Sequence, residues 1–249
     1  PLSAAIGMLE SAHGRDDVRV ADALASFGGL LYRVGEHEEA LPQLERALEL
    51  TEYTMGLDHP KTADVLETLG DVLLSLQRSE AALQHFIRAL AIRDAGPAEA
   101  TVASRCAARA ASAFRVVGRL EEAEAHYRRA LELLASESDP VPEARMLAEL
   151  AEVALRRRDG AKALSEAQRA RTLLQGQTGH DALRVRVEAQ LVLAILLTRS
   201  PSAARARFDV ALPPAEPAAE ERPSILVPLL VAGAEAALAD ADAVAALAL

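Results

Sequence analysis

Apolar residues recur along the chain at the spacing expected of amphipathic helices. Leu24, Gly28 and Leu31 lie on one face of a 3.6-residue helical period. Gly35 then interrupts the pattern, and a second apolar face begins at Ala40. This alternation of apolar face, turn and apolar face predicts two antiparallel helices.

The two-helix pattern is repeated with a period of 40–42 residues. Each second helix carries A-x₃-[large or Ala]-x₂-A, with first alanines at Ala40, Ala82, Ala123, Ala163 and, in a weaker copy, Ala204. Twelve residues earlier, the first helix has an aligned residue, usually small, that we name the crossing position: Gly28, Gly70, Ala111, Ala151 and Val192. Small side chains allow two helices to approach closely, so we expect each hairpin to cross there.

This pattern, [L/F]-G-x₂-[Y/L] followed by A-x₃-[F/Y/L]-x₂-A, resembles the tetratricopeptide (TPR) repeat. The units are longer than the usual ~34 residues, and the link Gly56-Leu-Asp-His-Pro60 is similar to that of the kinesin-light-chain type, which also occurs in bacterial regulatory proteins. The resemblance implies an all-α, right-handed superhelical solenoid of TPR-like helical hairpins.

The repeat register predicts a single TPR-like array over residues 1–249. Residues 1–14 are expected to form the second helix of a truncated repeat, and complete repeats are expected at 18–53, 61–94, 101–136, 142–175 and 182–211. Residues 212–223, rich in proline and acids, predict an extended surface link. Residues 224–249 predict an incomplete last repeat that stops about one turn into a second helix. Neither end carries a polar cap, so we interpret the chain as a fragment of a longer protein.

Helix boundaries follow from the same register. First helices are expected near 18–34, 61–76, 101–117, 142–157 and 182–198. Second helices are expected near 37–53, 79–94, 120–136, 160–175 and 202–211. Arginines in the later turns of second helices, such as Arg46, Arg88 and Arg129, are expected to interact with the helix dipole.

No motif in the sequence predicts catalysis or a bound metal. Phosphate-binding loops, dinucleotide fingerprints, zinc-protease motifs and serine-nucleophile elbows are absent from the sequence. His85 and His126 occupy equivalent places on neighbouring second helices, about 10 Å apart, which is too far to share a zinc ion bound at ~2 Å. Cys106 has no histidine or acid beside it in the sequence, so we expect a packed, inert thiol. We therefore expect no enzyme and no cofactor.

Composition narrows the class of partner. With 27 basic and 37 acidic residues, the net charge of −10 argues against binding to nucleic acid or anionic membranes. The longest apolar run is too short to span a bilayer. A single cysteine suits the cytoplasm. Arginine used in place of lysine, together with abundant alanine, indicates a GC-rich bacterial source.

The TPR resemblance implies that first helices line a concave groove where a peptide binds. Six residues before each crossing position stand Asp22, Asp64, Arg105, Arg145 and Arg186. Further groove candidates are Glu67, Asp71, Arg109, Ser112, Glu149 and Glu152. The row changes from acidic to basic, which predicts an extended partner carrying basic residues toward one end and acidic or phosphorylated residues toward the other. Alternatively, these arginines pair with Glu149 or Glu152, or are simply solvated.

Two functional interpretations remain open. The first is a non-enzymatic scaffold that binds a peptide or protein segment within a larger bacterial signalling protein; the uneven groove charge favours it. The second is an oligomerisation or domain-packing spacer within a multidomain kinase, regulator or protease-like effector, with self-association through uncapped ends.

Two binding schemes of related repeats are absent: the asparagine common in kinesin-light-chain-type repeats and the Lys/Asn carboxylate clamp of chaperone-binding ones. In place of that asparagine stand Ser26, Thr68, Arg109, Glu149 and Gln190.

Overall fold

The computed structural model describes residues 2–96, 99–135, 138–198, 201–221 and 227–247. Within these ranges every regular element is an α-helix, as the alanine-rich amphipathic pattern predicts. The chain divides into two compact units, Pro1–Leu133 and Leu134–Leu249. The repeat register predicts one array and does not mark this division.

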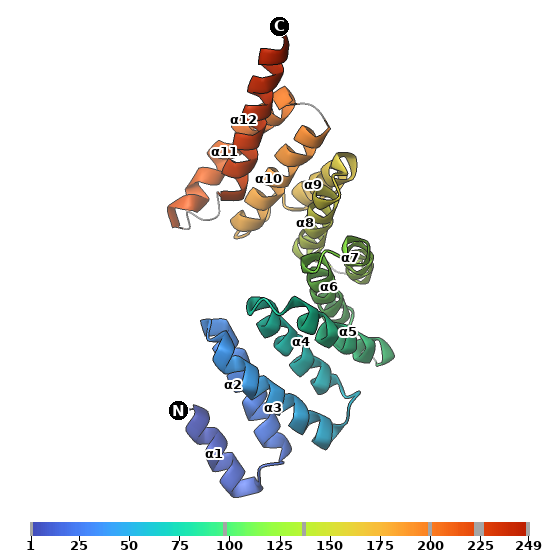
Figure 1. The fold of residues 1–249 in the computed structure, drawn as a ribbon, viewed down its shortest axis with the longest axis vertical. Helices are drawn as coiled ribbons and strands as arrows, with labels where there is room; N and C mark the ends of the chain where they lie inside the picture. The colour runs from blue at the N-terminus through green and yellow to red at the C-terminus, as the bar shows by residue number, and fades with distance from the viewer. Residues whose placement is uncertain (1, 97–98, 136–137, 199–200, 222–226, 248–249) are drawn as a thin grey trace. The chain divides into compact units, whose positions relative to one another are not determined.

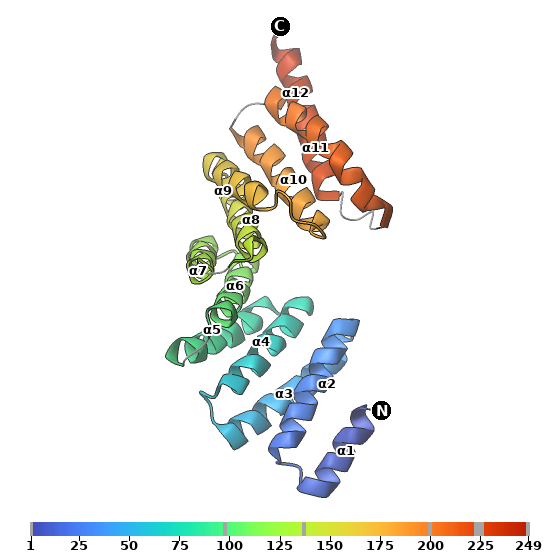
Figure 2. The ribbon, with the colours of Figure 1, turned by 180° about the vertical axis from the view of Figure 1, so that it is seen from behind.

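Unit 1 is a series of antiparallel helices that pack against their neighbours in chain order (Figures 1 and 2). Its helices are α1 (Leu2–His13), α2 (Val18–Val34), α3 (His37–Met55), α4 (Pro60–Ser75), α5 (Ser79–Ala95), α6 (Ala100–Val116) and α7 (Leu120–Leu133). The pairs α2/α3, α4/α5 and α6/α7 are the three predicted hairpins. Helix α1 packs on α2 and buries Ile6 against Val20 and Leu24.

Unit 2 continues the same pattern through two further hairpins (Figure 1). Its helices are α8 (Pro140–Arg156), α9 (Gly160–Leu173), α10 (Asp181–Leu197), α11 (Pro201–Glu221) and α12 (Val227–Leu247). All five predicted first helices begin and end within two residues of α2, α4, α6, α8 and α10. None of the helices in the described ranges combines the length and apolarity needed to cross a membrane.

The crossing position lies where the two helices of a hairpin touch. A Cβ added to Gly28 would stand 2.5 Å from Leu44 Cγ, and one added to Gly70 would stand 2.6 Å from Phe86 Cζ. Both leucine and phenylalanine are fully buried at these points. The prediction is therefore confirmed for these two hairpins: glycine is required because no other residue leaves room for the facing side chain.

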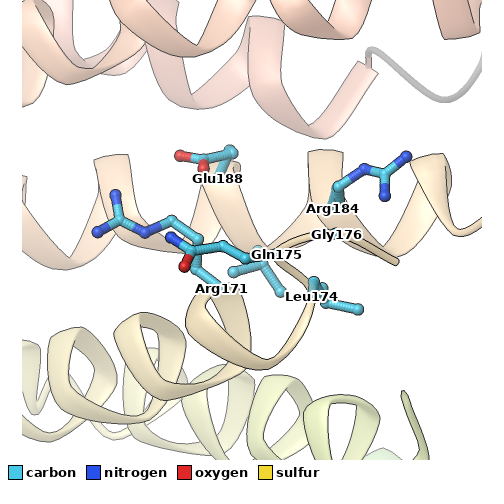
Figure 3. Close-up of a pocket in the computed structure, with 7 residues that line it drawn as sticks. Arg171, Leu174, Gln175, Gly176, Arg184 and Glu188 are labelled. Atoms are coloured by element: carbon cyan, nitrogen blue, oxygen red, sulfur yellow. The ribbon is translucent and has the colours of Figure 1, made fainter. Parts of the chain in front are cut away.

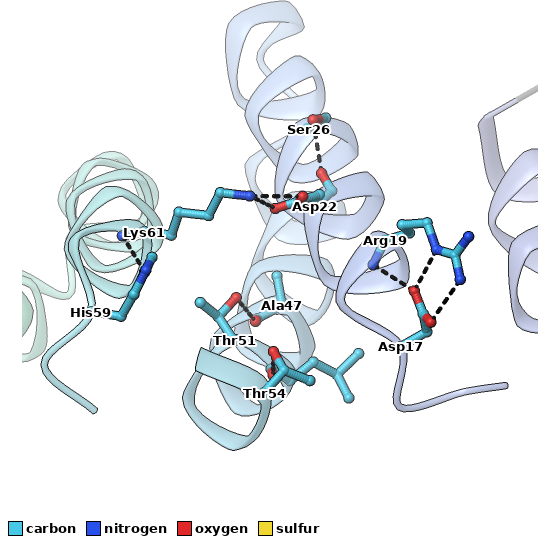
Figure 4. Close-up of polar contacts among 10 residues, drawn as sticks. Asp17, Arg19, Asp22, Ser26, Ala47, Thr51, Thr54, His59 and Lys61 are labelled. Atoms are coloured by element: carbon cyan, nitrogen blue, oxygen red, sulfur yellow. Dashed lines mark hydrogen bonds and ion pairs between the residues drawn. The ribbon is translucent and has the colours of Figure 1, made fainter. Parts of the chain in front are cut away.

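Turns and caps match the residues that occupy them. Gly35 and Gly118 adopt left-handed backbone angles, with φ of 90° and 84°, which glycine tolerates without strain. His59 caps α4, because its Nδ1 accepts a hydrogen bond from the Lys61 amide at 3.2 Å (Figure 4). Pro60 follows as the first helical residue, where no amide hydrogen bond is lost.

Two predictions for the C-terminal part are wrong. Residues 212–221 are not an extended link but continue helix α11; residues 222–223 lie outside the described ranges. Between the prolines, most residues of this stretch are alanine or glutamate, which strongly favour helix. Helix α12 is a single helix that packs on both α10 and α11, rather than a first helix followed by a turn. After Gly233 the sequence contains neither glycine nor proline to end it.

Candidate functional site

The predicted row lies on the outside of the first helices. Asp22, Asp64, Arg105 and Arg145 are exposed, and Arg186 is half-buried. The first three belong to α2, α4 and α6 of unit 1, and the last two belong to α8 and α10 of unit 2. The change from acid to base along the row therefore falls within unit 1, between α4 and α6.

The acidic end of the row is neutralised by the protein itself. Lys61 at the start of α4 donates hydrogen bonds to both carboxylate oxygens of Asp22, each at 2.8 Å (Figure 4). Arg93 of α5 donates to Asp64 at 2.5 Å. The Lys61–Asp22 pair is exposed and contributes only ~0–1 kcal/mol to stability, whereas Arg93 is buried and reaches the exposed Asp64 from within the packing. The effect of both pairs is to reduce the negative charge that these two positions offer to a partner.

Glu67, predicted as a groove residue, lies inside the packing between three helices. Its side chain is 2% exposed, and it accepts hydrogen bonds from Arg93 of α5 at 3.1 Å and from Arg109 of α6 at 2.6 Å. Arg109 also contacts Asp71 at 3.1 Å. We name Glu67, Asp71, Arg93 and Arg109 the buried ion cluster. Because a buried carboxylate is tolerated only when it is paired, this cluster holds the second and third hairpins together.

Asp71 is the titratable member of this cluster. Burial raises its pKa to about 6, although the guanidinium of Arg109 acts in the opposite direction. Arg105 acts on Asp71 through its charge alone: it is exposed and makes no ion pair within the part of unit 1 that the structure describes. Ser112, the next groove candidate on α6, is half-buried.

Cys106 is buried beside the same cluster. Burial and, to a smaller extent, the nearby Glu67 carboxylate raise the pKa of its thiol to about 12. Such a thiol remains protonated and has little nucleophilic character. In the described residues, no group of three histidine, cysteine, aspartate or glutamate side chains is placed to hold a metal ion.

In unit 2 the groove candidates divide into paired and unpaired residues. Arg186 of α10 donates to Glu149 of α8 at 2.7 Å, which confirms the alternative interpretation for this arginine. Glu152 pairs with Arg156, one turn later on the same helix. Arg145 is exposed and has no ion pair among the described residues of the unit. Arg105 and Arg145 are thus the two charges of the row that the protein does not compensate.

The sequence pattern missed a row of ion pairs between successive second helices. Arg46 of α3 contacts Glu10 of α1 at 2.5 Å, and Arg129 of α7 contacts Asp94 of α5 at 2.8 Å. Arg88 of α5 makes the same contact with Glu52 of α3. These arginines therefore link neighbouring repeats rather than acting only on their own helix dipoles. The signal that would have found them is an acid 35–36 residues before each arginine.

The comparison of sequence families decides what these helical pairs are. Residues 19–95 match the model of the tetratricopeptide repeat family, which here covers α2 to α5. Residues 19–95 are tetratricopeptide repeats. Among curated proteins, none matches this chain in sequence.

Solved structures show that the TPR fold extends well beyond the matched region. BtubC (BKLC) from P. vanneervenii superposes with a TM-score of 0.69 at 17% identity, over 83% of this chain and 84% of that one. A putative kinesin light chain from Podosopora anserina, with nearly identical TPR-like repeats, gives 0.69 at 13% identity over 82% and 97%. These matches show a fold of the kinesin-light-chain type.

A third structure places a similar TPR array within a longer protein. It is a signal transduction ATPase with numerous domains from Pyrococcus horikoshii, whose tetratricopeptide repeats are described as a sensor. It superposes with a TM-score of 0.74 at 17% identity, covering 88% of this chain but 33% of that chain. At such identities the similarity establishes the fold alone. TPR arrays are in general non-catalytic folds for protein–protein interaction.

Proposed function

We propose that the first-helix faces of the two units each bind an extended, acidic segment of a partner protein. The observation that carries the proposal is one uncompensated arginine in each unit, Arg105 in unit 1 and Arg145 in unit 2. Both stand at the outward-facing position of a first helix, both are exposed, and neither has an ion-pair partner within the described residues. The planar fork of arginine can hold a carboxylate or phosphate through two parallel hydrogen bonds.

The acidic half of the predicted groove contributes less to this proposal. Asp22 and Asp64 already hold Lys61 and Arg93, so a basic segment of the partner would have to displace them. Arg186 is likewise engaged by Glu149. We therefore expect an acidic or phosphorylated stretch to be the main feature that the partner presents, and basic residues at its other end to contribute little.

A charge-reversal experiment tests this proposal. An array of 12-residue peptides of varied charge is probed with the wild type, with the double variant Arg105→Glu/Arg145→Glu, and with a matched control, Arg33→Glu/Arg78→Glu. The control reverses two exposed arginines outside the row. We expect wild type and control to retain acidic peptides and the first variant to lose them, with all three equally stable. Retention of the same peptides by the groove variant would reject the proposal.

A second candidate function, self-association, is favoured by one face of α12. Val227, Leu230, Val231 and Leu238 are each about half-exposed or more, and they follow a helical spacing that forms one stripe. Apolar stripes of this kind commonly mark contact surfaces. Sedimentation of the wild type and of Val231→Glu/Leu238→Glu tests the idea: a dimer that dissociates in the variant supports it, and a monomeric wild type rejects it.

We further propose that the array acts as the recognition part of a larger cytoplasmic signalling protein in bacteria. The support is the P. horikoshii protein, whose tetratricopeptide repeats are described as a sensor and of whose chain the match covers a third. The acidic net charge and the single buried cysteine of the present chain are compatible with that setting.

A further inference from the structure

A polar hollow opens between α9 and α10 in unit 2. Its volume is about 510 Å³, which lies within the range of small-ligand pockets. Arg171 lines it from the last turn of α9 and Gln175 from the segment that follows this helix, and Glu188 faces them from α10, with Arg184 toward the other end (Figure 3). The buried side chains of Leu174 and Val187 form its apolar lining.

The repeat register shows how unusual these charged residues are. Glu188 stands four residues before the crossing position Val192. At the same place the other first helices carry fully buried apolar residues: Leu24, Leu66, Ala107 and Leu147. Arg171 stands eight residues after Ala163, where the earlier second helices carry Leu48, Leu90 and Leu131. Two apolar packing positions have therefore become charged on the two facing helices of one junction.

The charges around the hollow are only partly compensated by the protein. Glu188 pairs with Arg207 of α11, and Arg184 pairs with Asp181 and with the carbonyl of Gln177. Arg171 has no ion pair or hydrogen bond within the described residues, and its Nε is buried without an acceptor. Arg171 is half-buried as a residue, and its guanidinium can donate hydrogen bonds to an anion. The hollow therefore offers one unpaired guanidinium to an anionic group.

We infer that this hollow is a binding pocket for the carboxylate of a peptide ligand, held by Arg171. The side-chain amide of Gln175 and the free lone pairs of Glu188 provide further hydrogen bonds for the amide groups beside that carboxylate. Arg186, the groove residue of α10, lies two positions from both Arg184 and Glu188, which turns it to nearly the opposite face of the helix. The pocket is thus separate from the proposed groove and does not depend on it.

Arginine Nε–H resonances in ¹⁵N-labelled protein provide a direct readout. The Arg171 signal, assigned by its loss in Arg171→Gln, is followed during titration with N-acetyl-Leu-Glu-amide, N-acetyl-Leu-Gln with a free C-terminus, and the uncharged N-acetyl-Leu-Gln-amide. We expect a saturable shift with at least one carboxylate probe and at least tenfold weaker binding of the uncharged one. The carboxylate probe that binds more tightly shows whether the pocket prefers the carboxylate of an acidic side chain or that of a chain terminus. Equal binding of all three peptides, or a response to inorganic phosphate alone, would overturn the inference.

Restoring the leucine of the other repeats separates binding from packing. Arg171→Leu is expected to abolish the response to the carboxylate probes, read from the backbone amides of Gln175 and Gly176, and to raise the melting temperature. Arg205→Leu, which changes an arginine of α11 that does not line the hollow, is the matched control and should leave the response to the carboxylate probes unchanged. Should Arg171→Leu fail to fold, Arg171→Gln gives the same test, because it removes the charge but remains polar. Undiminished carboxylate binding in a folded Arg171 variant would contradict the inference.

Discussion

The buried ion cluster of unit 1 and the hollow of unit 2 both hold charges between helices, but these charges differ in how they are paired. In the cluster, Glu67 is enclosed by Arg93 and Arg109, and every charge has a partner on a neighbouring helix. In the hollow, Arg171 lies between helices with no partner in the part of the chain that the structure describes. The contrast suggests a criterion: a buried charge that its own fold compensates supports packing, whereas an uncompensated one points to a ligand.

Removing the centre of the cluster should have the largest effect. Glu67→Ala leaves Arg93 and Arg109 facing each other without a carboxylate, so we expect a loss of about 3–5 kcal/mol in unfolding free energy. Urea denaturation measures it, with Asp22→Ala as an exposed control that should change stability by less than ~1 kcal/mol. A Glu67→Ala variant as stable as that control would show that the cluster does not hold the hairpins together.

The crossing position tests whether the helices around the cluster are packed as closely as the structure indicates. Gly70→Leu forces a side chain against Phe86, and we expect a cost of about 1–3 kcal/mol. Gly29→Ala is the matched control, because a Cβ there meets no atom within 4 Å. It should stabilise α2 by roughly 0.5–1 kcal/mol, since alanine is the better helix former. Thermal melts that fail to separate the two variants would mean that the hairpin register is wrong.

Asp71 gives the cluster a pH dependence with a defined sign. Its pKa is raised to about 6, so below that pH the folded protein retains a proton that the unfolded chain has already lost. Stability from this group is therefore greatest below pH 4 and falls as pH rises from about 4 to 6, by about 1–3 kcal/mol. The difference in unfolding free energy between wild type and Asp71→Asn should change across this window. A difference independent of pH would show that Asp71 titrates normally.

The ion pairs between second helices should have the smallest effect. A double-mutant cycle on Arg129 and Asp94 is expected to give a coupling of ~0–1 kcal/mol, because both side chains are partly exposed. Added salt should reduce the coupling further. A coupling above about 2 kcal/mol would show that these pairs contribute to stability as buried ion pairs do, and not as exposed ones.

Most of the fold could be predicted from the sequence, because helical periodicity and the repeat reinforce each other. The first helices follow from the spacing of residues such as Leu24 and Leu31, and the crossing position follows from Gly28 and Gly70. The C-terminal helices could not be predicted in the same way. The prolines of residues 212–223 indicate an extended link, but the alanine and glutamate residues between them favour the helix that forms.

The candidate site was harder to predict, because it depends on how neighbouring helices are rotated. Glu67 and Asp64 differ by three residues and look equivalent in sequence, yet one is buried and the other exposed. Which arginine reaches which acid depends on the packing of α4, α5 and α6. The repeat register shows that Arg171 and Glu188 replace apolar residues. It does not show that the two side chains face one hollow.

The most direct test of the criterion compares two arginine-to-leucine variants by urea unfolding. Arg93→Leu removes a partner of buried Glu67, so we expect a loss of about 3–5 kcal/mol. Arg171→Leu removes an unpaired charge and restores the apolar residue of the other repeats, so we expect a gain of about 0.5–2 kcal/mol. Opposite signs would support the distinction between a compensated charge and a ligand-binding one. A loss of stability in both variants would contradict it, since Arg171 would then be part of the packing.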